Sequence, residues 1–402
     1  MKSYISLCLL SHKLLFLIFI YYSFFRRRYA LKISIDARGV NLYKGSGIGT
    51  YIENLLRELL NIDKKNTYSI FWAGENYNEF KKNNSKIIFT SKRHGGFYEN
   101  YYYPSFIKNN NIDLHHIPQN GIGLNSLYTS PVVVTIHDLI PYILPQTVGR
   151  GYLERFLKDM PFIINNAKAI LTVSEYSKKD ILRFFPSIKE EKIFVTPLAA
   201  NLNYKPLNKT SCKDYIKNKY NIYSPFLLYI GGFSTRKNVR EIILSFKKIY
   251  KSLNKDYKLV LCGSVRDEGA KLQELCKELF IDDKIIFTGF IPDDDLPYFY
   301  NASELFIYPS LYEGFGLPPL EAMSCATPVI ASNLTSIPEV TENNAVLINP
   351  NNTDELASAI LYLLNSPDLL LKYGQMGYKH SLNFNWQNTA TSTLKAYESI
   401  LI

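Results

Sequence analysis

Residues 309–323 read PSLYEGFGLPPLEAM, and they join a predicted strand to a predicted helix. The apolar run before them, 305–308, predicts a buried strand, and the residues from Leu320 onward predict a helix. The turn between them has glycines at 314 and 316 and a proline pair. A glycine turn at a helix N-terminus gathers oriented backbone N–H groups, so this segment favours an anion.

Two glutamates bracket this turn, Glu313 before it and Glu321 inside the predicted helix. A carboxylate at each end of an amide-lined turn fits a ligand that has hydroxyl groups at both ends and phosphate in the middle. A nucleotide sugar has this layout. Glycine-rich turns alone are weak signals. An ordinary strand-to-helix turn with solvated acids therefore fits the segment equally well until the rest of the chain is considered.

The length of 402 residues predicts two domains. The composition, 47% hydrophobic and 20% charged, is that of a folded protein. The formal charge of +10 fits nucleic acid, anionic lipid or a phosphorylated substrate. No basic run interleaved with aromatic residues marks a nucleic-acid module, so we predict no nucleic-acid partner. The five cysteines form no Cys-x-x-Cys pair, which favours a reducing compartment.

Two groups of residues have the chemistry of metal ligands without a suitable arrangement. His115 and His116 are adjacent, and adjacent residues of a strand point to opposite faces. Asp293, Asp294 and Asp295 precede a predicted helix, where acids favour the helix dipole. We therefore expect these aspartates to cap the helix, and we expect no metal site.

Residues 1–30 form a hydrophobic N-terminal segment. Its uninterrupted apolar part, 14–25, is shorter than the roughly 20 residues that cross a bilayer, although the length suffices when it is counted from Tyr4. Arginines at 26–28 would hold the main body on the cytoplasmic side. Three interpretations stay open: a membrane anchor or re-entrant helix, an interfacial helix, and an upstream extension from a misplaced start codon.

The regular pattern of the first half begins with a predicted strand at 31–36, a glycine-containing loop at 44–50 and a predicted helix at 51–60. A dinucleotide-binding fingerprint has a similar layout. This loop is longer than that motif allows, and no acidic residue closes a second strand at the expected distance. An NAD-dependent enzyme is therefore a rival interpretation. Gly47 would let the backbone approach a phosphate or an acceptor, unless the helix start merely needs small residues.

His137 follows the β-branched run 131–136, which predicts a central parallel strand covered on both faces. In open α/β sheets, ligands gather at the carboxyl ends of the strands. The position of His137 directly after the strand favours a functional role over that of a core histidine.

The second half repeats the alternation of strands and helices. A predicted strand at 226–230 ends in Gly231 and Gly232, and Arg236 and Lys237 follow. A guanidinium fork and an ammonium group beside two glycines suit a pyrophosphate. Exposed basic residues in a turn are the alternative.

The whole pattern predicts an α/β protein with two parallel-sheet domains. The expected divisions are a hydrophobic segment at 1–30, a first domain at 31–202, a linker at 203–213, a second domain at 214–385 and a last helix at 386–402. Two such halves would face each other across a cleft, with the basic and acidic motifs on its second wall.

These residues together resemble the retaining glycosyltransferases of family 4, the large group 1 family with the GT-B fold. The resemblance extends from about residue 31 to the end of the chain. Its most specific residues are Glu313, Gly314, Phe315, Gly316 and Glu321 in combination with Gly231, Gly232, Arg236 and Lys237. The family implies two Rossmann-like domains, the first on the acceptor side and the second binding the nucleotide sugar, with a C-terminal helix that crosses back to the first.

The resemblance also implies roles for individual residues. Arg236 and Lys237 would neutralise the donor pyrophosphate and stabilise the leaving nucleoside diphosphate. Glu321 would hold the ribose hydroxyl groups. Glu313 would bond to hydroxyl groups of the donor sugar, and His137 would touch this sugar near the reacting carbon.

Further implied donor contacts belong to the two glycine loops and to the base. The backbone of Gly314, Phe315, Gly316 and Leu317 would meet the sugar and the phosphate, Gly47 would close on the phosphate, and Phe290 would lie near the base. The sequence departs from the family pattern at Gly232, where many relatives carry arginine. Either Arg236 supplies the missing charge or the phosphate is held less tightly.

The implied chemistry follows from charge. Departure of the leaving group creates an oxocarbenium-like sugar and a diphosphate anion, and fixed cations stabilise that anion as it forms. We therefore expect no metal or other cofactor. The sequence offers no clear carboxylate nucleophile of the kind that retaining glycosidases use. The route implied by the family is front-face attack by the acceptor, with the leaving phosphate as base.

Within the family, residues 36–40 together with 47–51 look like those of bacterial mannosyltransferases of O-antigen or capsule assembly. This likeness implies transfer of mannose from GDP-mannose to a saccharide or polyprenyl-linked saccharide, in contact with the inner face of the plasma membrane. The alternatives are a UDP-sugar-dependent transferase of the same family and a non-catalytic relative that binds nucleotide sugars.

Overall fold

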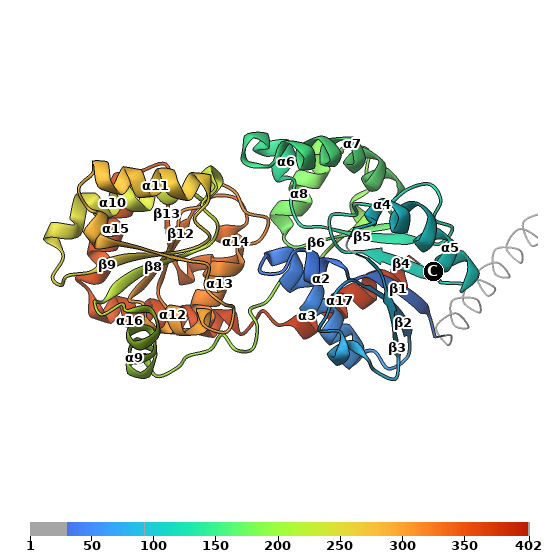
Figure 1. The fold of residues 1–402 in the computed structure, drawn as a ribbon, viewed down its shortest axis with the longest axis horizontal. Helices are drawn as coiled ribbons and strands as arrows, with labels where there is room; N and C mark the ends of the chain where they lie inside the picture. Colours follow the sequence, from blue (N-terminus) through green and yellow to red (C-terminus); the bar gives the residue numbers. More distant parts are fainter. Residues whose placement is uncertain (1–29, 92, 401–402) are drawn as a thin grey trace, which may run out of the picture.

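The computed structural model describes residues 30–91 and 93–400. Within them, two parallel sheets form two lobes that lie side by side (Figure 1). The three interpretations of the N-terminal segment concern residues outside this described part. None of the helices in the described part has the length and apolar character needed to cross a bilayer.

The N-terminal lobe is built on seven parallel strands of the described chain, in the order β3-β2-β1-β4-β5-β6-β7. The order reverses between β1 and β4, which makes this pair the switch point where open α/β sheets bind ligands. Every residue of β4, β5 and β6 is buried because helices cover both faces of the sheet. The strands are β1 (Lys32–Asp36), β2 (Thr67–Trp72), β3 (Ser85–Phe89), β4 (Leu114–Ile117), β5 (Val132–Ile136), β6 (Ala169–Thr172) and β7 (Ile193–Val195).

Helix α3 packs one apolar face into the core of the N-terminal lobe. Leu55, Leu56 and Leu59 recur at helical spacing and are buried in the core of this lobe. The hydroxyl of Ser46 caps the helix by accepting from the N–H of Gly49 at 3.4 Å. The helices of this lobe are α2 (Gly39–Leu42), α3 (Gly47–Ile62), α4 (Gly95–Phe97), α5 (Tyr103–Asn109), α6 (Ile140–Ile143), α7 (Arg150–Asn166) and α8 (Glu175–Phe184), with a π-helical turn at Tyr98–Tyr102.

The C-terminal lobe repeats the plan with six parallel strands of the described chain, in the order β10-β9-β8-β11-β12-β13. Its switch point lies between β8 and β11. The prediction of two Rossmann-like parallel-sheet domains is therefore confirmed. The strands are β8 (Phe226–Ile230), β9 (Lys258–Cys262), β10 (Ile285–Gly289), β11 (Leu305–Tyr308), β12 (Val329–Ser332) and β13 (Val346–Ile348).

The first helix of the second lobe begins inside the range that was expected to be a linker. Helix α9 starts at Lys209, inside the range expected to be a linker, because the side chain of Asn208 caps it by accepting from Ser211 N at 2.9 Å. The helices are α9 (Lys209–Tyr220), α10 (Val239–Ile249), α11 (Asp267–Glu278), α12 (Leu296–Ala302), α13 (Leu317–Ser324), α14 (Ile337–Thr341), α15 (Thr353–Leu364), α16 (Pro367–Ser381) and α17 (Trp386–Ser399).

The aspartates at 293–295 were expected to cap α12, but the side chain of Asp295, the N-cap residue, does not cap the helix. It occupies the N-cap position and its backbone carbonyl accepts from the N–H of Tyr298 at 3.0 Å, but its side chain makes no capping bond to the helix. Its carboxylate instead accepts from Tyr215 OH at 2.6 Å and from Lys219 Nζ at 2.7 Å. The Asp295 carboxylate therefore bonds to side chains of α9 instead of the amides of α12, and the bond to the Lys219 ammonium is charge-assisted. Asp295 thereby links α9 to α12.

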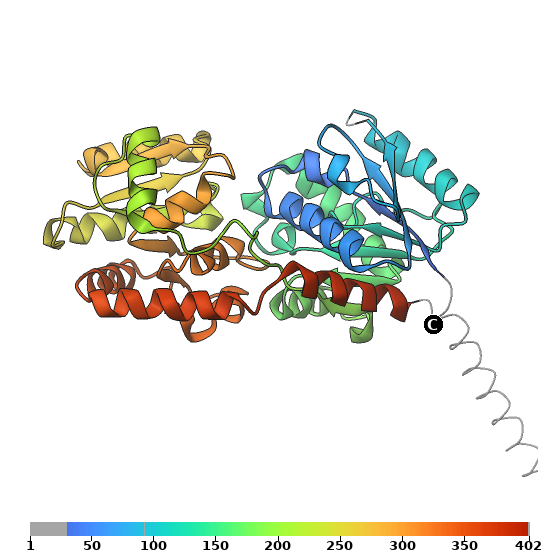
Figure 2. The ribbon, with the colours of Figure 1, turned by 90° about the horizontal axis from the view of Figure 1, so that it is seen from below.

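The last helix, α17, crosses from the second lobe to the first, as expected. Figure 2 shows α16 beneath the C-terminal lobe and α17 beneath the N-terminal lobe. The hydroxyl of Tyr397 bonds to Nδ1 of buried His116 at 2.7 Å, and Thr389 donates to the carbonyl of Pro197 at 2.5 Å. These bonds fix the end of the chain to the lobe in which it began.

Helix α8 makes the polar contacts that join the lobes near the cleft. Ser174 and Ser177, at its N-terminus, donate to the carbonyl of Gly314 at 2.6 and 3.0 Å. Farther along the helix, Asp180 accepts from the hydroxyl of Tyr312 at 2.5 Å. The loop after β11 is therefore held against the other lobe by three side chains.

Glu339 of α14 completes this junction. Its two carboxylate oxygens accept from the backbone N–H groups of Glu175 and Tyr176 at 2.8 and 3.0 Å. These amides lie at the start of α8, where backbone N–H groups have no acceptor within the helix. The helix dipole favours a negative charge at this end.

We expect Glu339→Ala to weaken the junction between the lobes, because the first amides of α8 lose their charged partner. Small-angle scattering should show a larger radius of gyration, and the transfer rate should fall by about tenfold if the lobes must meet for catalysis. Asp368→Ala, which removes an exposed acid from α16, serves as the control. An unchanged radius and rate in Glu339→Ala would contradict this role.

Candidate functional site

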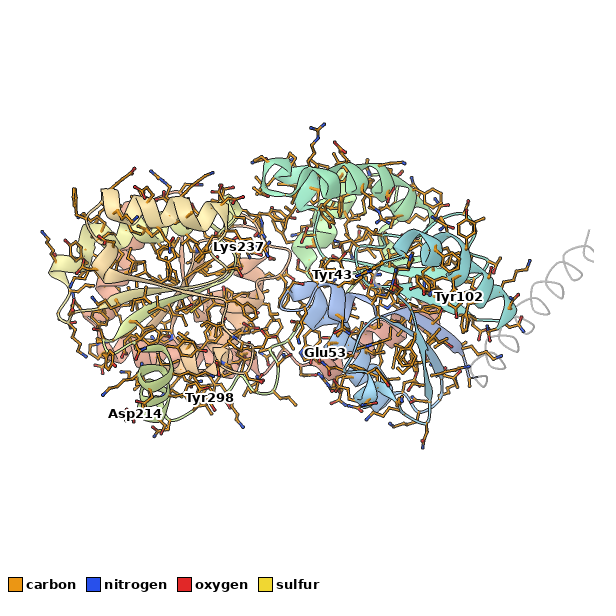
Figure 3. All side chains as sticks on the ribbon, viewed as in Figure 1. Tyr43, Glu53, Tyr102, Asp214, Lys237 and Tyr298 are labelled. Carbon is orange, nitrogen blue, oxygen red and sulfur yellow. The ribbon has the colours of Figure 1, made fainter. Side chains whose placement is uncertain are left out.

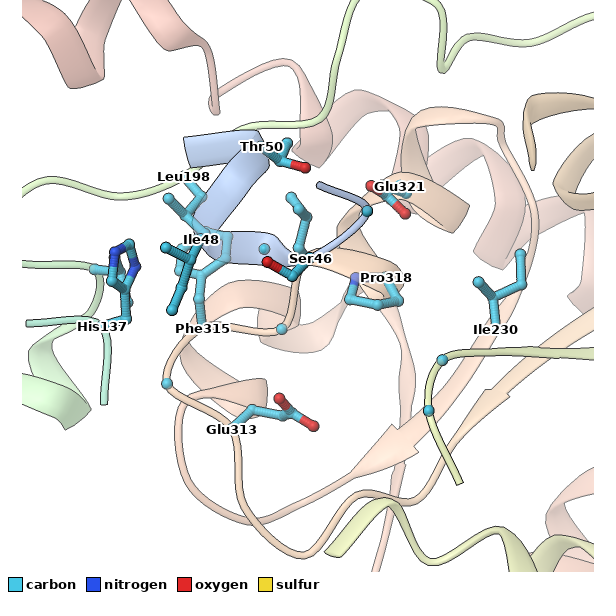
Figure 4. Close-up of a pocket in the computed structure, with 18 of the residues that line it drawn as sticks. Ser46, Ile48, Thr50, His137, Leu198, Ile230, Glu313, Phe315, Pro318 and Glu321 are labelled. Carbon is cyan, nitrogen blue, oxygen red and sulfur yellow. The ribbon is translucent and has the colours of Figure 1, made fainter. Parts of the chain in front are cut away.

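A cavity of about 540 Å³ lies between the two lobes (Figure 4). It opens at the carboxyl ends of β8 and β11 on one side and faces the start of α3 and the end of β5 on the other. The predicted residues that line it are Gly47, His137, Arg236, Lys237, Glu313, Gly314, Phe315, Gly316, Leu317 and Glu321.

One carboxylate oxygen, Oε1 of Glu313, lies at the centre of the charged part of the cavity. Lys237 Nζ approaches it at 2.6 Å and Arg236 Nη1 at 2.9 Å. Ser310 Oγ and Tyr308 OH also donate to it, at 2.6 and 3.0 Å. These donors come from β11 and from the loops that follow β8 and β11, so the switch point of the second sheet assembles the cluster.

This arrangement determines the charge of the cluster. Burial opposes ionisation of Glu313, but Lys237 and Arg236 outweigh it and lower its pKa to about 2. Two cations share one ionised carboxylate, so one net positive charge remains. Burial raises the pKa of the nearby Asp138 carboxyl group. The cluster can therefore hold an anion in a largely desolvated position.

Glu321 lies within α13, and its environment is the opposite of that of Glu313. Burial raises the pKa of its carboxyl group to about 8, and its hydrogen-bond partner is the hydroxyl of Tyr300 at 2.9 Å. The neighbouring carboxylate of Asp293 also raises this pKa. A buried carboxyl group with neutral partners is suited to hydroxyl groups of a ligand, since these can donate to it without adding charge.

His137 lies at the end of β5, on the opposite wall. Its Nε2 atom donates to the carbonyl of Pro118 at 2.8 Å, which leaves Nδ1 as the acceptor nitrogen. Burial lowers the pKa of the imidazole to about 4, so the ring is neutral at pH 7. Tyr51 meets the ring edge-on with centroids 4.9 Å apart. The site thus presents a fixed, uncharged imidazole to the cavity.

The glycines of the loop before α13 and of the loop before α3 differ in how much space a side chain would have. A Cβ atom on Gly314 would lie 2.2 Å from the carbonyl oxygen of His137, across the junction of the lobes. Gly316 has φ +111°, which favours glycine, and a Cβ there would lie 2.6 Å from Ile337. A Cβ on Gly47 would meet nothing within 4 Å, so packing alone does not require glycine at that position.

Two further expectations concern Phe290 and Gly232. Phe290 is 65% exposed and does not line the cavity; its ring lies 3.7 Å from the position of a Cβ on Gly45. Gly232 lines the cavity, and a Cβ there would meet nothing within 4 Å, so the place of the family's arginine is open. The contact of Phe290 with a base stays a prediction.

The cavity also contains residues that the sequence reasoning did not select. Tyr204 comes from the predicted linker, Asp293 follows β10, and Tyr43 precedes α3. Asp293 lies shortly after β10, which ends in Gly289, and this strand-end position could have indicated a cavity-lining residue. Nothing in the local pattern marks Tyr204, because only the crossing of the chain between the lobes brings it to the cavity. In the described residues, no group of three or more His, Cys, Asp and Glu side chains could hold a metal ion.

Comparison with known families and proteins now identifies the class. Residues 213–380 match the family described as glycosyl transferases group 1, and residues 45–204 match glycosyltransferase family 4. An O-antigen chain mannosyltransferase B of Escherichia coli is 34% identical over 266 residues, which cover 66% of this chain and 70% of that protein. The chain belongs to the group 1, family 4 glycosyltransferases, and it is a glycosyltransferase enzyme.

Two other comparisons add detail. The serotype-specific mannosyltransferase WbdA of Escherichia coli is 28% identical over 273 residues, which cover 67% of this chain but only 33% of that longer protein. The solved structure of HepE from Anabaena, in complex with UDP and glucose, superposes with a TM-score of 0.73 at 15% identity, covering 92% of this chain and 100% of HepE. This structural likeness shows that the fold is GT-B.

We expect Lys237→Ala to lower the transfer rate constant by about 10² to 10³, because the fixed cation that meets the leaving diphosphate is lost. Circular dichroism and the melting temperature should stay close to wild type, since Arg236 still pairs with Glu313. Lys248→Ala, which removes an exposed lysine of α10, is the control. Wild-type turnover by Lys237→Ala would refute the assigned role.

Glu321 predicts a pH dependence of stability. Its folded-state pKa of about 8 lies above the ordinary value of 4.5, so its contribution is fully present below pH 4.5 and is lost as pH rises through about 8. Without nucleotide, the free energy of unfolding of the wild type should fall relative to Glu321→Gln by on the order of 2 kcal/mol between pH 6 and 8. Urea unfolding at the two pH values measures this difference. Parallel curves would show that Glu321 titrates normally.

Proposed function

We propose that this enzyme transfers mannose from GDP-mannose to a saccharide acceptor, with retention of the anomeric configuration, in the assembly of a bacterial surface polysaccharide. The cluster of Arg236, Lys237 and Glu313 supports the nucleotide-sugar donor, because its residual positive charge fits a diphosphate beside a sugar. The O-antigen chain mannosyltransferases among its relatives support mannose and the pathway.

In this proposal the donor lies across the carboxyl ends of β8 and β11. Glu321 accepts from the ribose hydroxyl groups, Arg236 and Lys237 hold the diphosphate, and Glu313 contacts the donor sugar. The binding of a diphosphate redistributes the two cations between Glu313 and the phosphate oxygens. Before the donor binds, Glu313 is ionised, because Lys237 and Arg236 lower its pKa to about 2.

The acceptor hydroxyl then attacks from the face that the diphosphate leaves. The leaving phosphate takes the proton of that hydroxyl, so the bond from the anomeric carbon to phosphate oxygen breaks while a bond to the acceptor oxygen forms. The cations stabilise the developing phosphate charge, and the proposed route needs no metal ion. The neutral ring of His137 contacts the sugar without adding charge near the oxocarbenium-like centre.

We also propose that the enzyme works at the inner face of the plasma membrane. The apolar segment at 1–30, the arginines at 26–28 and the formal charge of +10 support contact with an anionic membrane surface. A polyprenyl-linked saccharide would be presented at this surface.

A panel of donors tests the proposal. We expect GDP to bind more tightly than UDP, NAD to show no binding, and transfer to proceed with GDP-mannose at a rate at least tenfold above that with UDP-sugars. The anomeric proton coupling of the product, measured by NMR, should show the configuration of the donor. A preference for UDP-sugars would show that GDP-mannose is not the donor. A product with inverted anomeric configuration would refute the retaining mechanism. Absence of nucleoside-diphosphate binding would refute the proposed function.

A further inference from the structure

Tyr308, the last residue of β11, connects the two sides of the charged cluster. Its hydroxyl accepts from Lys237 Nζ at 2.6 Å and donates to Oε1 of Glu313 at 3.0 Å. A hydroxyl group can do both at once because it carries one proton and two lone pairs. Burial raises the pKa of this hydroxyl well above its ordinary value, so the proton stays in place at neutral pH. Tyr308 is therefore a neutral donor to the carboxylate.

The position of this hydroxyl is fixed by packing. The ring of Tyr308 is fully buried, and it stacks on Tyr229 of β8 and on Phe306 of β11 with centroids 6.1 and 5.9 Å apart. These two strands are neighbours in the middle of the second sheet. The ammonium group of Lys237 lies over the same ring, 5.0 Å from its centroid. Tyr308 thus presents its hydroxyl from a rigid part of the lobe.

The two cations of the cluster are placed differently. Arg236 and Lys237 belong to the short 3-10 helical turn Thr235–Lys237, between β8 and α10. Figure 3 shows Lys237 on the side of the C-terminal lobe that faces the other lobe. Both cations approach Oε1 of Glu313. A diphosphate that binds these cations competes with Glu313 for them.

This competition leaves the carboxylate in need of other partners. A buried carboxylate that loses its cations is strongly destabilising unless hydrogen bonds remain. Tyr308 and Ser310 donate to Oε1 at 3.0 and 2.6 Å, and neither belongs to the turn that carries the cations. Both can stay on this oxygen when Lys237 turns to the phosphate. The other oxygen, Oε2, accepts none of these bonds and is left for a ligand.

We propose that Tyr308 is a positioning residue for the transfer reaction, which holds Oε1 of Glu313 while Lys237 moves from the carboxylate to the leaving diphosphate. The inference rests on the proposed function, which it deepens by adding a residue that acts through Glu313. The hydroxyl binds both partners of the ion pair before it opens. Afterwards it keeps Oε2 directed at the donor sugar. Tyr308 therefore acts on the sugar end of the donor and not on the affinity for the diphosphate.

The test compares Tyr308→Phe with the wild type, both as full chains. Phenylalanine keeps the ring, its stacking and its contact with the ammonium group, and it removes only the two hydroxyl bonds. We expect kcat with saturating GDP-mannose to fall by about tenfold, while the Kd of GDP, which carries no sugar, changes by less than about threefold. Tyr362→Phe, which removes a hydroxyl from a 63% exposed side chain of α15, should leave both values unchanged.

The split between kcat and Kd separates positioning from a general disturbance of the site. A loss of GDP affinity as large as the loss of kcat would overturn the inference, and so would an unchanged kcat in the folded variant. If Tyr308→Phe does not fold, a fluorinated tyrosine placed at position 308 of the otherwise unchanged chain decides. Its fluorine NMR resonance should shift on saturation with GDP, because Lys237 leaves the hydroxyl. An unchanged resonance would overturn the inference.

These outcomes are distinguishable from a failure of the proposed function. If the wild type binds GDP and transfers mannose but Tyr308→Phe keeps full kcat, only the role of Tyr308 is refuted. If the wild type binds no GDP, the proposed function is refuted, and the role of Tyr308 is refuted with it.

Discussion

The buried carboxylate of Glu313 sets the arrangement of the donor side. An ionised carboxylate away from water requires charged partners, and Lys237 and Arg236 supply them at 2.6 and 2.9 Å. These partners come from the loop after β8, so the electrostatic requirement joins two loops that the sequence separates by more than seventy positions. The glycine turn after Glu313 then reaches the other lobe, where a side chain on Gly314 would collide with the backbone of His137.

The two lobes use the same topological device for different chemistry. At the switch point of the second sheet, the two cations Arg236 and Lys237 share the carboxylate of Glu313. At the switch point of the first, Arg38 is buried against Asp36. Between the two lobes, the start of α8 and the carboxylate of Glu339 form a polar junction near the cavity.

Most of the strands and the cavity-lining residues were predictable because their signals are local. Apolar runs such as 131–136 specify buried strands, and the residues after them fall at strand ends whatever the rest of the chain does. The expected capping by Asp295 was inferred from its position at a helix start alone. In the structure, Tyr215 and Lys219 of α9, a helix far away in the sequence, bind its carboxylate instead. Phe290 follows a strand too, yet its ring stays largely exposed at the edge of the cavity.

The sequence alone determined the fold class, the family and which charged residues line the cavity, since periodicity, glycine turns and strand-end motifs are properties of short segments. Only the tertiary structure decided how these residues are paired and what charge remains. It placed Arg236 and Lys237 on one oxygen of Glu313, buried Glu321 beside the hydroxyl of Tyr300 and paired Arg38 with Asp36. Ion pairing and burial depend on distances between segments far apart in the chain, and no local pattern contains those distances.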